Sequence, residues 1–201
     1  MADEHNKQDR YKTRQQKVKD EVDARVAAAQ TEKGILLVIT GNGKGKSTSG
    51  FGTIARAVGH GQKCGVGQFI KGTWDNGERN LLEQHGVTFA VMGTGFTWDT
   101  QDKEADTIAA QTTWAECKKM LTDASYDVVL LDELTYMLTY GYLDIDEVLD
   151  TIAQRPPEQS VVVTGRAAHR RLTDMADTVS EVRNIKHAFE SGIKARKGVD
   201  W

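Results

Sequence analysis

The segment GILLVITGNGKGKSTSGFG, residues 34–52, constrains the fold of this chain more than any other stretch. It opens with a short apolar run, which predicts a buried strand over 34–40. A helical pattern follows the glycines and is expected to end at Gly59 or Gly61. Glycines let backbone N–H groups turn toward an anion without obstruction by a Cβ atom, and a helix N-terminus adds a favourable dipole. A strand, a glycine-rich turn and a helix in this order predict a phosphate-binding loop.

Individual side chains of the turn suit a nucleoside triphosphate. Lys46 is expected to neutralise phosphate charge, and the Ser47 hydroxyl is expected to bind a magnesium ion. The general pattern G-x-x-x-x-G-K-[ST] places its first glycine where this chain has Thr40, so the loop begins at Gly41 and is one residue shorter. The orientation of the nucleotide therefore stays open, and a glycine-rich turn without a ligand is the alternative. The expected cradle comprises Gly41, Asn42, Gly43, Lys44, Gly45, Lys46, Ser47 and Thr48.

A second element of the expected site is acidic. The stretch VVLLDE, residues 128–133, places Asp132 and Glu133 directly after four apolar residues. This pattern is typical of a strand that delivers carboxylates to the carboxyl end of a sheet, where they hold a magnesium ion or its waters. The alternatives are acids that merely cap the next turn, or a standard ATPase in which Glu133 polarises water.

Apolar runs and helical segments alternate along the rest of the chain, which predicts a mainly parallel sheet with helices on both faces. We therefore expect an α/β fold, a P-loop NTPase-like three-layer sandwich with about six strands. The strands are expected at 34–40, 63–70, 87–92, 126–134, 160–166 and 177–186. Beyond the helix after the glycine-rich turn, helices are expected at 76–86, 103–124, 144–155 and 167–176.

Residues 1–33 differ from the remainder and are expected to form a helical arm ahead of one domain over 34–201. Val18, Val22 and Val26 recur every four residues in a strongly charged background, which predicts a thin amphipathic helix. One interpretation is a solvated arm. The other is an arm that packs over the active site or onto a neighbouring subunit.

Composition excludes several classes of function. The net charge of −3 argues against a broad nucleic-acid surface. The two cysteines, Cys64 and Cys117, are far apart and predict reduced thiols, with no structural zinc site. No apolar run approaches the ~20 residues that span a bilayer, and the acidic, polar start is unlike a signal peptide. We therefore expect a cytoplasmic protein that binds neither membranes nor nucleic acid.

Three motifs, GNGKGKST, DELTY at 132–136 and VVVTGR at 161–166, occur together with GTGFTWDTQD at 93–102. In this combination the chain resembles the P-loop type of ATP:cob(I)alamin adenosyltransferase, also called corrinoid adenosyltransferase, over nearly its whole length. The shortened loop belongs to that family's pattern, although Ser47 stands where many relatives have threonine.

The resemblance implies that the 5′-deoxyadenosyl group of ATP is transferred to the Co(I) of a cobalamin or cobinamide-type corrinoid, with release of tripolyphosphate. It also implies Mg²⁺, an electron-donating reductase such as a flavoprotein, and a homodimer. Lys46 and Glu133 would be catalytic, and Lys44 would help to stabilise the leaving polyphosphate. Arg166, at the end of the strand expected at 160–166, is a weaker candidate for a phosphate contact, and a salt bridge at the strand end is the alternative.

The aromatic residues Phe96 and Trp98 lie two positions apart in a glycine-flanked loop. The resemblance implies that they press on the corrin and exclude its lower axial ligand, which makes Co(II) easier to reduce. Without the resemblance, two loop aromatics that pack into the core are the simpler interpretation. His169 and His187 are weaker candidates for the site.

Two other functions remain open. A small P-loop kinase or NTPase would produce ADP and would not need Phe96 and Trp98. A binding or carrier protein would hold a corrinoid without chemistry, although the presence of Lys46, Ser47 and Glu133 argues against it.

Overall fold

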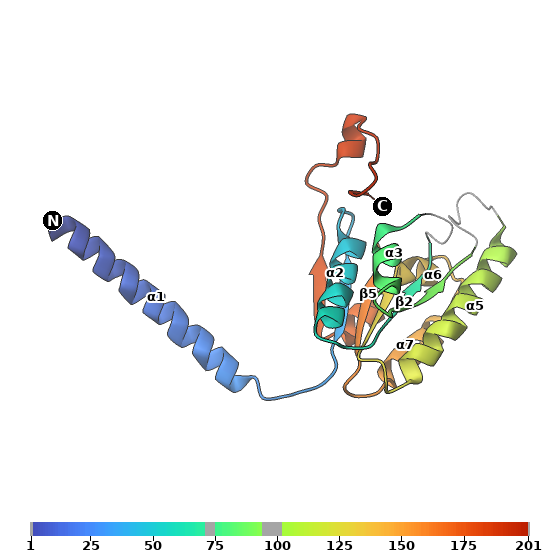
Figure 1. Ribbon diagram of the computed structural model, residues 1–201, viewed down its shortest axis with the longest axis horizontal. Coiled ribbons are helices and arrows are strands. Elements are labelled where there is room, and N and C mark those ends of the chain that lie inside the picture. The colour runs from blue at the N-terminus through green and yellow to red at the C-terminus, as the bar shows by residue number, and fades with distance from the viewer. Residues whose placement is uncertain (1, 71–74, 94–101, 201) are drawn as a thin grey trace. The chain divides into compact units, whose positions relative to one another are not determined.

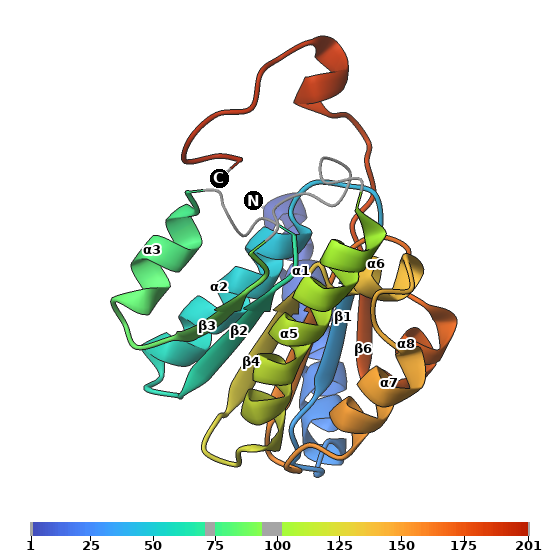
Figure 2. The same cartoon turned by 90° about the vertical axis from the view of Figure 1, so that its right-hand side faces the viewer.

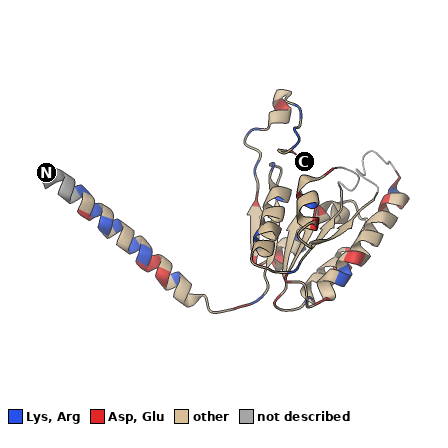
Figure 3. Ribbon diagram, viewed as in Figure 1, with Lys and Arg blue, Asp and Glu red and all other residues tan. Residues whose placement is uncertain are grey.

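The computed structural model describes residues 2–70, 75–93 and 102–200 (Figure 1). The chain divides into two compact units, Met1–Glu32 and Lys33–Trp201, and each is described by itself. In the first unit, helix α1 (Ala2–Ala28) lies where the sequence predicts a helix. Lysine, arginine and acidic residues are distributed along α1 (Figure 3), and its apolar side chains, Tyr11, Val18, Val22 and Val26, are exposed.

The second unit is built on a parallel sheet of six strands with the order β3-β2-β4-β5-β1-β6. The strands are β1 (Leu36–Thr40), β2 (Cys64–Gln68), β3 (Thr88–Val91), β4 (Val128–Asp132), β5 (Ser160–Thr164) and β6 (Thr178–Glu181). The predicted fold class, an α/β three-layer sandwich with a mainly parallel sheet, is confirmed. Each strand lies within its predicted range, and the ends are shorter by a few residues.

Helices cover both faces of this sheet (Figure 2). One face carries α2 (Lys46–Gly59) and α3 (Gly77–Glu83), which share an apolar cluster around Phe51, Ile54 and Leu82. The other face buries a larger cluster that includes Trp114, Leu134, Met137 and Ile152. Its helices are α5 (Lys103–Thr122), α6 (Leu134–Thr139), α7 (Ile145–Ala153) and α8 (Arg170–Met175).

Two glycines of β2 explain how closely α5 packs on the sheet. A Cβ atom at Gly65 would lie 2.5 Å from the Met120 sulfur, and one at Gly67 would lie 2.3 Å from the Cys117 sulfur. Larger residues at these positions would push the helix away from the strand. Alternate residues of a strand point to opposite faces, so Val66 and Gln68 point away from α5.

The structure adds two elements that the sequence did not indicate. Helix α6 begins directly after Glu133, where the sequence predicts that a strand continues to residue 134. With six residues, α6 is too short for a helical period to show in the sequence. A 3₁₀ helix, η1 (Ala188–Ser191), lies in the C-terminal segment.

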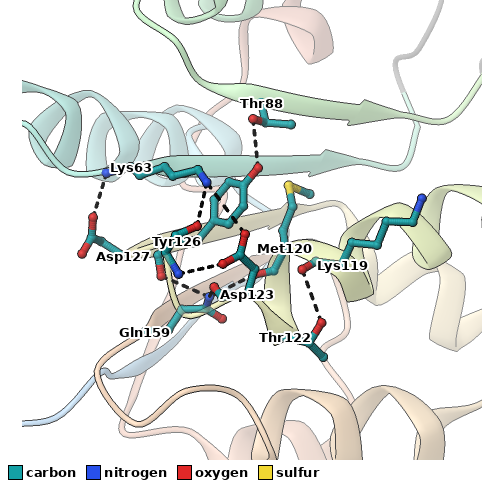
Figure 4. Close-up of polar contacts among 10 residues, drawn as sticks. Lys63, Thr88, Lys119, Met120, Thr122, Asp123, Tyr126, Asp127 and Gln159 are labelled. Atoms are coloured by element: carbon teal, nitrogen blue, oxygen red, sulfur yellow. Dashed lines mark hydrogen bonds and ion pairs between the residues drawn. The ribbon is translucent and has the colours of Figure 1, made fainter.

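The amino ends of the central strands form one edge of the sheet, which we call the amino edge; a buried glutamine holds it together (Figure 4). The side-chain nitrogen of Gln159 donates hydrogen bonds to the carbonyl oxygens of Met120, Asp123 and Tyr126, at 3.0, 3.2 and 3.1 Å. These bonds tie the end of α5 to the turn that enters β4. Nearby, the Lys63 backbone N–H donates to the Asp127 carboxylate at 2.7 Å. Among the residues that the structure describes, no helix is long and apolar enough to span a membrane.

Candidate functional site

The carboxyl ends of the strands form the opposite edge, the carboxyl edge, and carry a cavity of about 330 Å³. Crevices outside the carboxyl ends of parallel strands are the usual ligand sites of such folds. The predicted site residues that line the cavity are Asn42, Gly43, Lys44, Gly45, Lys46, Ser47, Thr48, Asp132, Glu133 and Arg166. The structure thus brings together two motifs, about ninety positions apart in the sequence, that were predicted to meet. Gly41 is not part of the lining.

The glycine-rich loop between β1 and α2 has backbone geometry that glycine allows. Gly41 and Gly45 have φ angles of 101° and 117°, in the range that other residues rarely adopt. A Cβ atom at Gly41 would also lie 2.4 Å from the carbonyl oxygen of Val182. The same carbonyl accepts a hydrogen bond of 2.7 Å from the Gly43 N–H. The loop is therefore held by the chain that follows β6.

Lys46 is the first residue of α2 and is only 7% exposed. Its ammonium donates a hydrogen bond of 2.8 Å to the carbonyl oxygen of Gly43, across the loop. The helix N-terminus behind it carries a partial positive charge, and its first N–H groups lack partners within the helix. The cationic side chain and the helix end together provide an anion site.

Thr40, which replaces the first glycine of the general pattern, has a structural use. Its hydroxyl accepts a hydrogen bond of 3.2 Å from the Ala168 N–H, in the connection between β5 and α8. That connection also carries Arg166 into the cavity wall. Gly165 in the same connection has a φ of 138°, and a Cβ atom there would lie 2.0 Å from the Thr135 hydroxyl of α6.

The two carboxylates lie where β4 ends. Asp132 is 1% exposed, and the Thr164 hydroxyl donates to its Oδ1 at 2.6 Å. The same hydroxyl oxygen accepts a hydrogen bond of 3.0 Å from the Glu133 N–H. Glu133 has a φ of 60°, a left-handed conformation that is strained for a residue other than glycine. Such strain is concentrated at functional sites, and here it turns the chain sharply into α6.

The C-terminal segment closes one side of the cavity, which sequence reasoning missed. Ala195, Val199 and Asp200 belong to the lining, and the Lys44 ammonium lies 2.5 Å from the Asp200 carboxylate. The hydrogen bond from Lys44, followed by the Arg196 N–H, lowers the pKa of Asp200. The segment has mixed charge and no period, so no sequence signal pointed to this position.

Residues 75–78 form a further part of the wall. Asp75, Asn76 and Glu78 line the cavity, and Lys197 of the C-terminal segment lies 3.1 Å from the Asp75 carboxylate. A hydrogen bond from Asn80, and then one from Lys197, lower the pKa of Asp75.

Tyr136, from α6, also lines the cavity. Its pKa is raised by burial and then by the Glu133 carboxylate, so the hydroxyl stays protonated and can donate a hydrogen bond.

Of the two candidate histidines, one lines the cavity and the other does not. His187 lines the cavity, and its Nδ1 accepts a hydrogen bond from the Phe189 N–H at the start of η1. His169 is not in the lining; its Nδ1 accepts from the Arg171 N–H at the start of α8.

The aromatics Phe96 and Trp98 fall in residues 94–101, outside the described part of the chain, so their role stays a prediction.

The residues present fit a magnesium–nucleotide complex. Within the described ranges no cluster of three or more His, Cys, Asp or Glu side chains is arranged for a metal ion. Magnesium does not require one, because it binds through one or two carboxylates, substrate phosphates and waters. Ser47, Asp132 and Glu133 line the same cavity as the glycine-rich loop, and their hydroxyl and carboxylate oxygens are of the kind that magnesium binds.

Comparison with known proteins places these features in a family. A sequence model described as ATP:corrinoid adenosyltransferase BtuR/CobO/CobP matches residues 32–201. The chain is 61% identical over 201 residues to a corrinoid adenosyltransferase of Escherichia coli (strain K12), and 62% identical to the corrinoid adenosyltransferase CobA of Salmonella typhimurium. It is 47% identical over 203 residues to a corrinoid adenosyltransferase of Pseudomonas aeruginosa. All three alignments cover the full length of both chains.

Proposed function

The chain belongs to the ATP:corrinoid adenosyltransferase family, and we propose that it transfers the 5′-deoxyadenosyl group of ATP to the Co(I) of a corrinoid. The observation that carries this proposal is the cavity at the carboxyl edge. It joins a shortened phosphate loop with Asp132 and Glu133 in a chain that matches the family over residues 32–201.

The proposed reaction displaces the whole polyphosphate. The Co(I) of the corrinoid substrate donates an electron pair to C5′ of the ribose, a cobalt–carbon bond forms, and the C5′–O bond breaks. The electrons of that bond leave with the tripolyphosphate, so no protein base or nucleophile is required. The protein's task is to place the two substrates and to stabilise the charge that gathers on the leaving group.

The phosphate cradle suits that task. Loop N–H groups, the helix dipole and the Lys46 ammonium are fixed before ATP arrives, and a preorganised site stabilises developing charge without further rearrangement. Lys44 is bound by the Asp200 carboxylate, so we expect phosphate oxygens to take the place of that carboxylate. Mg²⁺, when bound, would neutralise further phosphate charge, and Ser47, Asp132 and Glu133 would hold it.

Five finer statements belong to this proposal. We expect Phe96 and Trp98 to act on the lower face of the corrin, a reductase such as a flavoprotein to supply electrons, and two copies to form a homodimer in the cytoplasm. We also assign residues 1–33 to an arm and 34–201 to the catalytic domain, which the division after Glu32 supports.

The test is an incubation with ATP, Mg²⁺ and chemically reduced cobalamin, followed by identification of the products. We expect tripolyphosphate and a corrinoid with a new cobalt–carbon bond in equal amounts. ADP as the nucleotide product would identify a kinase or NTPase. Bound corrinoid together with unchanged ATP would identify a carrier.

A further inference from the structure

A row of polar side chains crosses the sheet on the face that α2 covers. Closer to the amino edge on the same face, three strands contribute a row of apolar residues to the cluster under α2, namely Val66, Leu130 and Val162. Two residues further along each strand stand Gln68, Asp132 and Thr164, and alternation places them on the same face. The backbone register pairs Gln68 with Asp132, and Leu131 of β4 with Val163 of β5. Asp132 therefore lies between Gln68 and Thr164.

The two neighbours of Asp132 differ in how their polar atoms are used. The Thr164 hydroxyl donates to the Asp132 carboxylate and accepts from the Glu133 N–H. Gln68 is 1% exposed, and neither its side-chain nitrogen nor its oxygen has a hydrogen-bond partner within the described residues. A primary amide offers two donors and an acceptor with two lone pairs, and burying it without partners is unfavourable.

The direction of the Gln68 side chain follows from its neighbours along β2. Gly67 faces the Cys117 sulfur on the α5 side, so Gln68 faces the opposite side, toward α2. Asp132 in the adjacent strand lines the cavity on that side, beside the phosphate cradle. Gln68 is not itself part of the cavity lining; it lies beside Asp132 in the sheet, next to the wall that carries the carboxylate.

We propose that Gln68 is a positioning residue for the magnesium–ATP complex. Its amide forms hydrogen bonds with a water ligand of the ion beside Asp132, so that its polar atoms gain partners only when the complex is bound. The inference rests on the proposed function, because it requires ATP and Mg²⁺ in this cavity. It gives partners to the two polar atoms of the Gln68 amide, which have none in the fold itself.

The test compares two buried glutamines at opposite edges of the sheet. Gln68→Met removes the amide and keeps most of the side-chain volume; Gln159→Met does the same at the amino edge. The dissociation constant for ATP is measured by calorimetry, once with Mg²⁺ and once with excess EDTA, and the melting temperature of each variant is recorded.

We expect Gln68→Met to weaken ATP binding roughly 3- to 10-fold with Mg²⁺, the range for one lost hydrogen bond to a bound water. With EDTA its affinity should stay within about twofold of the wild type. Its melting temperature should not fall, because the lost amide had no partner in the fold. Gln159→Met should melt lower and bind magnesium–ATP normally.

Two results would overturn the inference: unchanged affinity of Gln68→Met with Mg²⁺, or an equal loss with Mg²⁺ and with EDTA. If Gln68→Met does not fold, Gln68→Asn serves instead, since it keeps a shorter amide that cannot reach as far; the same magnesium-dependent loss is expected. Failure of the wild type to bind ATP at all would remove the proposed function itself, which separates that failure from failure of this inference.

Discussion

Gln159 and Gln68 are both buried glutamines of the same sheet, one at the amino edge and one at the carboxyl edge. The Gln159 nitrogen donates to three carbonyl oxygens, although its Oε1 has no partner among the described residues. Neither amide atom of Gln68 has a partner there, and Gln68 pairs in the sheet with Asp132, which lines the cavity. The Gln159 amide is bonded within the chain and stabilises the fold, whereas for Gln68 we propose that the missing partners come from the ligand.

The backbone shows the same difference between the edges. At the carboxyl edge, Glu133 and Ala167 adopt left-handed φ angles of 60° and 48°. At the amino edge the turn residues Gly61 and Gly86 have positive φ, and a Cβ atom at either would meet no other atom within 4 Å. Strain of this kind persists only where surrounding contacts enforce it, as Thr164 does for Glu133.

Replacement of Lys46 should have the largest effect. Lys46→Ala removes a preorganised charge from the phosphate cradle, and we expect adenosyl transfer to fall about 10²–10³-fold, since one such contact to developing charge contributes roughly 3–4 kcal/mol. The control is Lys63→Ala at the amino edge, where the ammonium bonds Ser125. That variant should turn over normally. Near-normal turnover of folded Lys46→Ala would remove the phosphate loop from the mechanism.

Replacement of Phe96 or Trp98 tests whether the protein acts on the cobalt as well as on ATP. Phe96→Ala and Trp98→Ala should impair turnover strongly when the corrinoid enters as Co(II), because a lower ligand must then be excluded before reduction. With chemically generated Co(I), which has already lost that ligand, the loss should be much smaller. Lys46→Ala should be impaired with both. Equal losses in the two assays would refute ligand displacement.

Replacement of Gln159 tests the amino edge by itself. Gln159→Met leaves carbonyl oxygens of the α5–β4 turn without their donor, and we expect a loss of about 1–3 kcal/mol in the free energy of unfolding. For a chain of this size that lowers the melting temperature by about 2–4 °C per kcal/mol. Turnover at temperatures well below melting should not change. A loss of turnover without a loss of stability would show that the two edges are coupled.

The layered fold could be predicted from the sequence because its signals are local. Strands β1, β4 and β5 are nearly continuous apolar runs, and the glycine-rich loop indicates which strand end faces the ligand. Helix α6 was missed because six residues, Leu134–Thr139, are too few for a helical period to show. Its start depends on the conformation of Glu133, which Thr164 sets from a different strand.

The site could be predicted in part for the same reason. Lys46, Asp132 and Glu133 lie in motifs that directly follow apolar strands in the sequence. Because parallel strands end at the same edge of a sheet, these residues are expected to meet there. The contribution of Asp200 depends on an ion pair with Lys44, 156 positions away, which no local pattern encodes. The sequence likewise gives no sign that the buried Gln68 amide lacks hydrogen-bond partners, because that depends on which groups the fold places around it.

Replacement of Asp200 should have the smallest effect and the opposite sign. The Asp200 carboxylate forms an ion pair with the Lys44 ammonium, which we expect to bind a phosphate of ATP. The carboxylate and the phosphate therefore compete for Lys44. Asp200→Asn removes the competing charge, and we expect magnesium–ATP to bind about two- to fivefold more tightly, the modest size typical of a partly exposed ion pair. Because the pKa of Asp200 is lowered by Lys44, the wild-type carboxylate stays ionised well below neutral pH. The gain should therefore be constant between about pH 6 and 8.

Calorimetric titrations with ATP at several pH values measure this gain in affinity. Asp123→Asn at the amino edge is the matched control, for which no gain is expected. Weaker binding by Asp200→Asn would show that the carboxylate holds Lys44 in place for the nucleotide rather than competing with it.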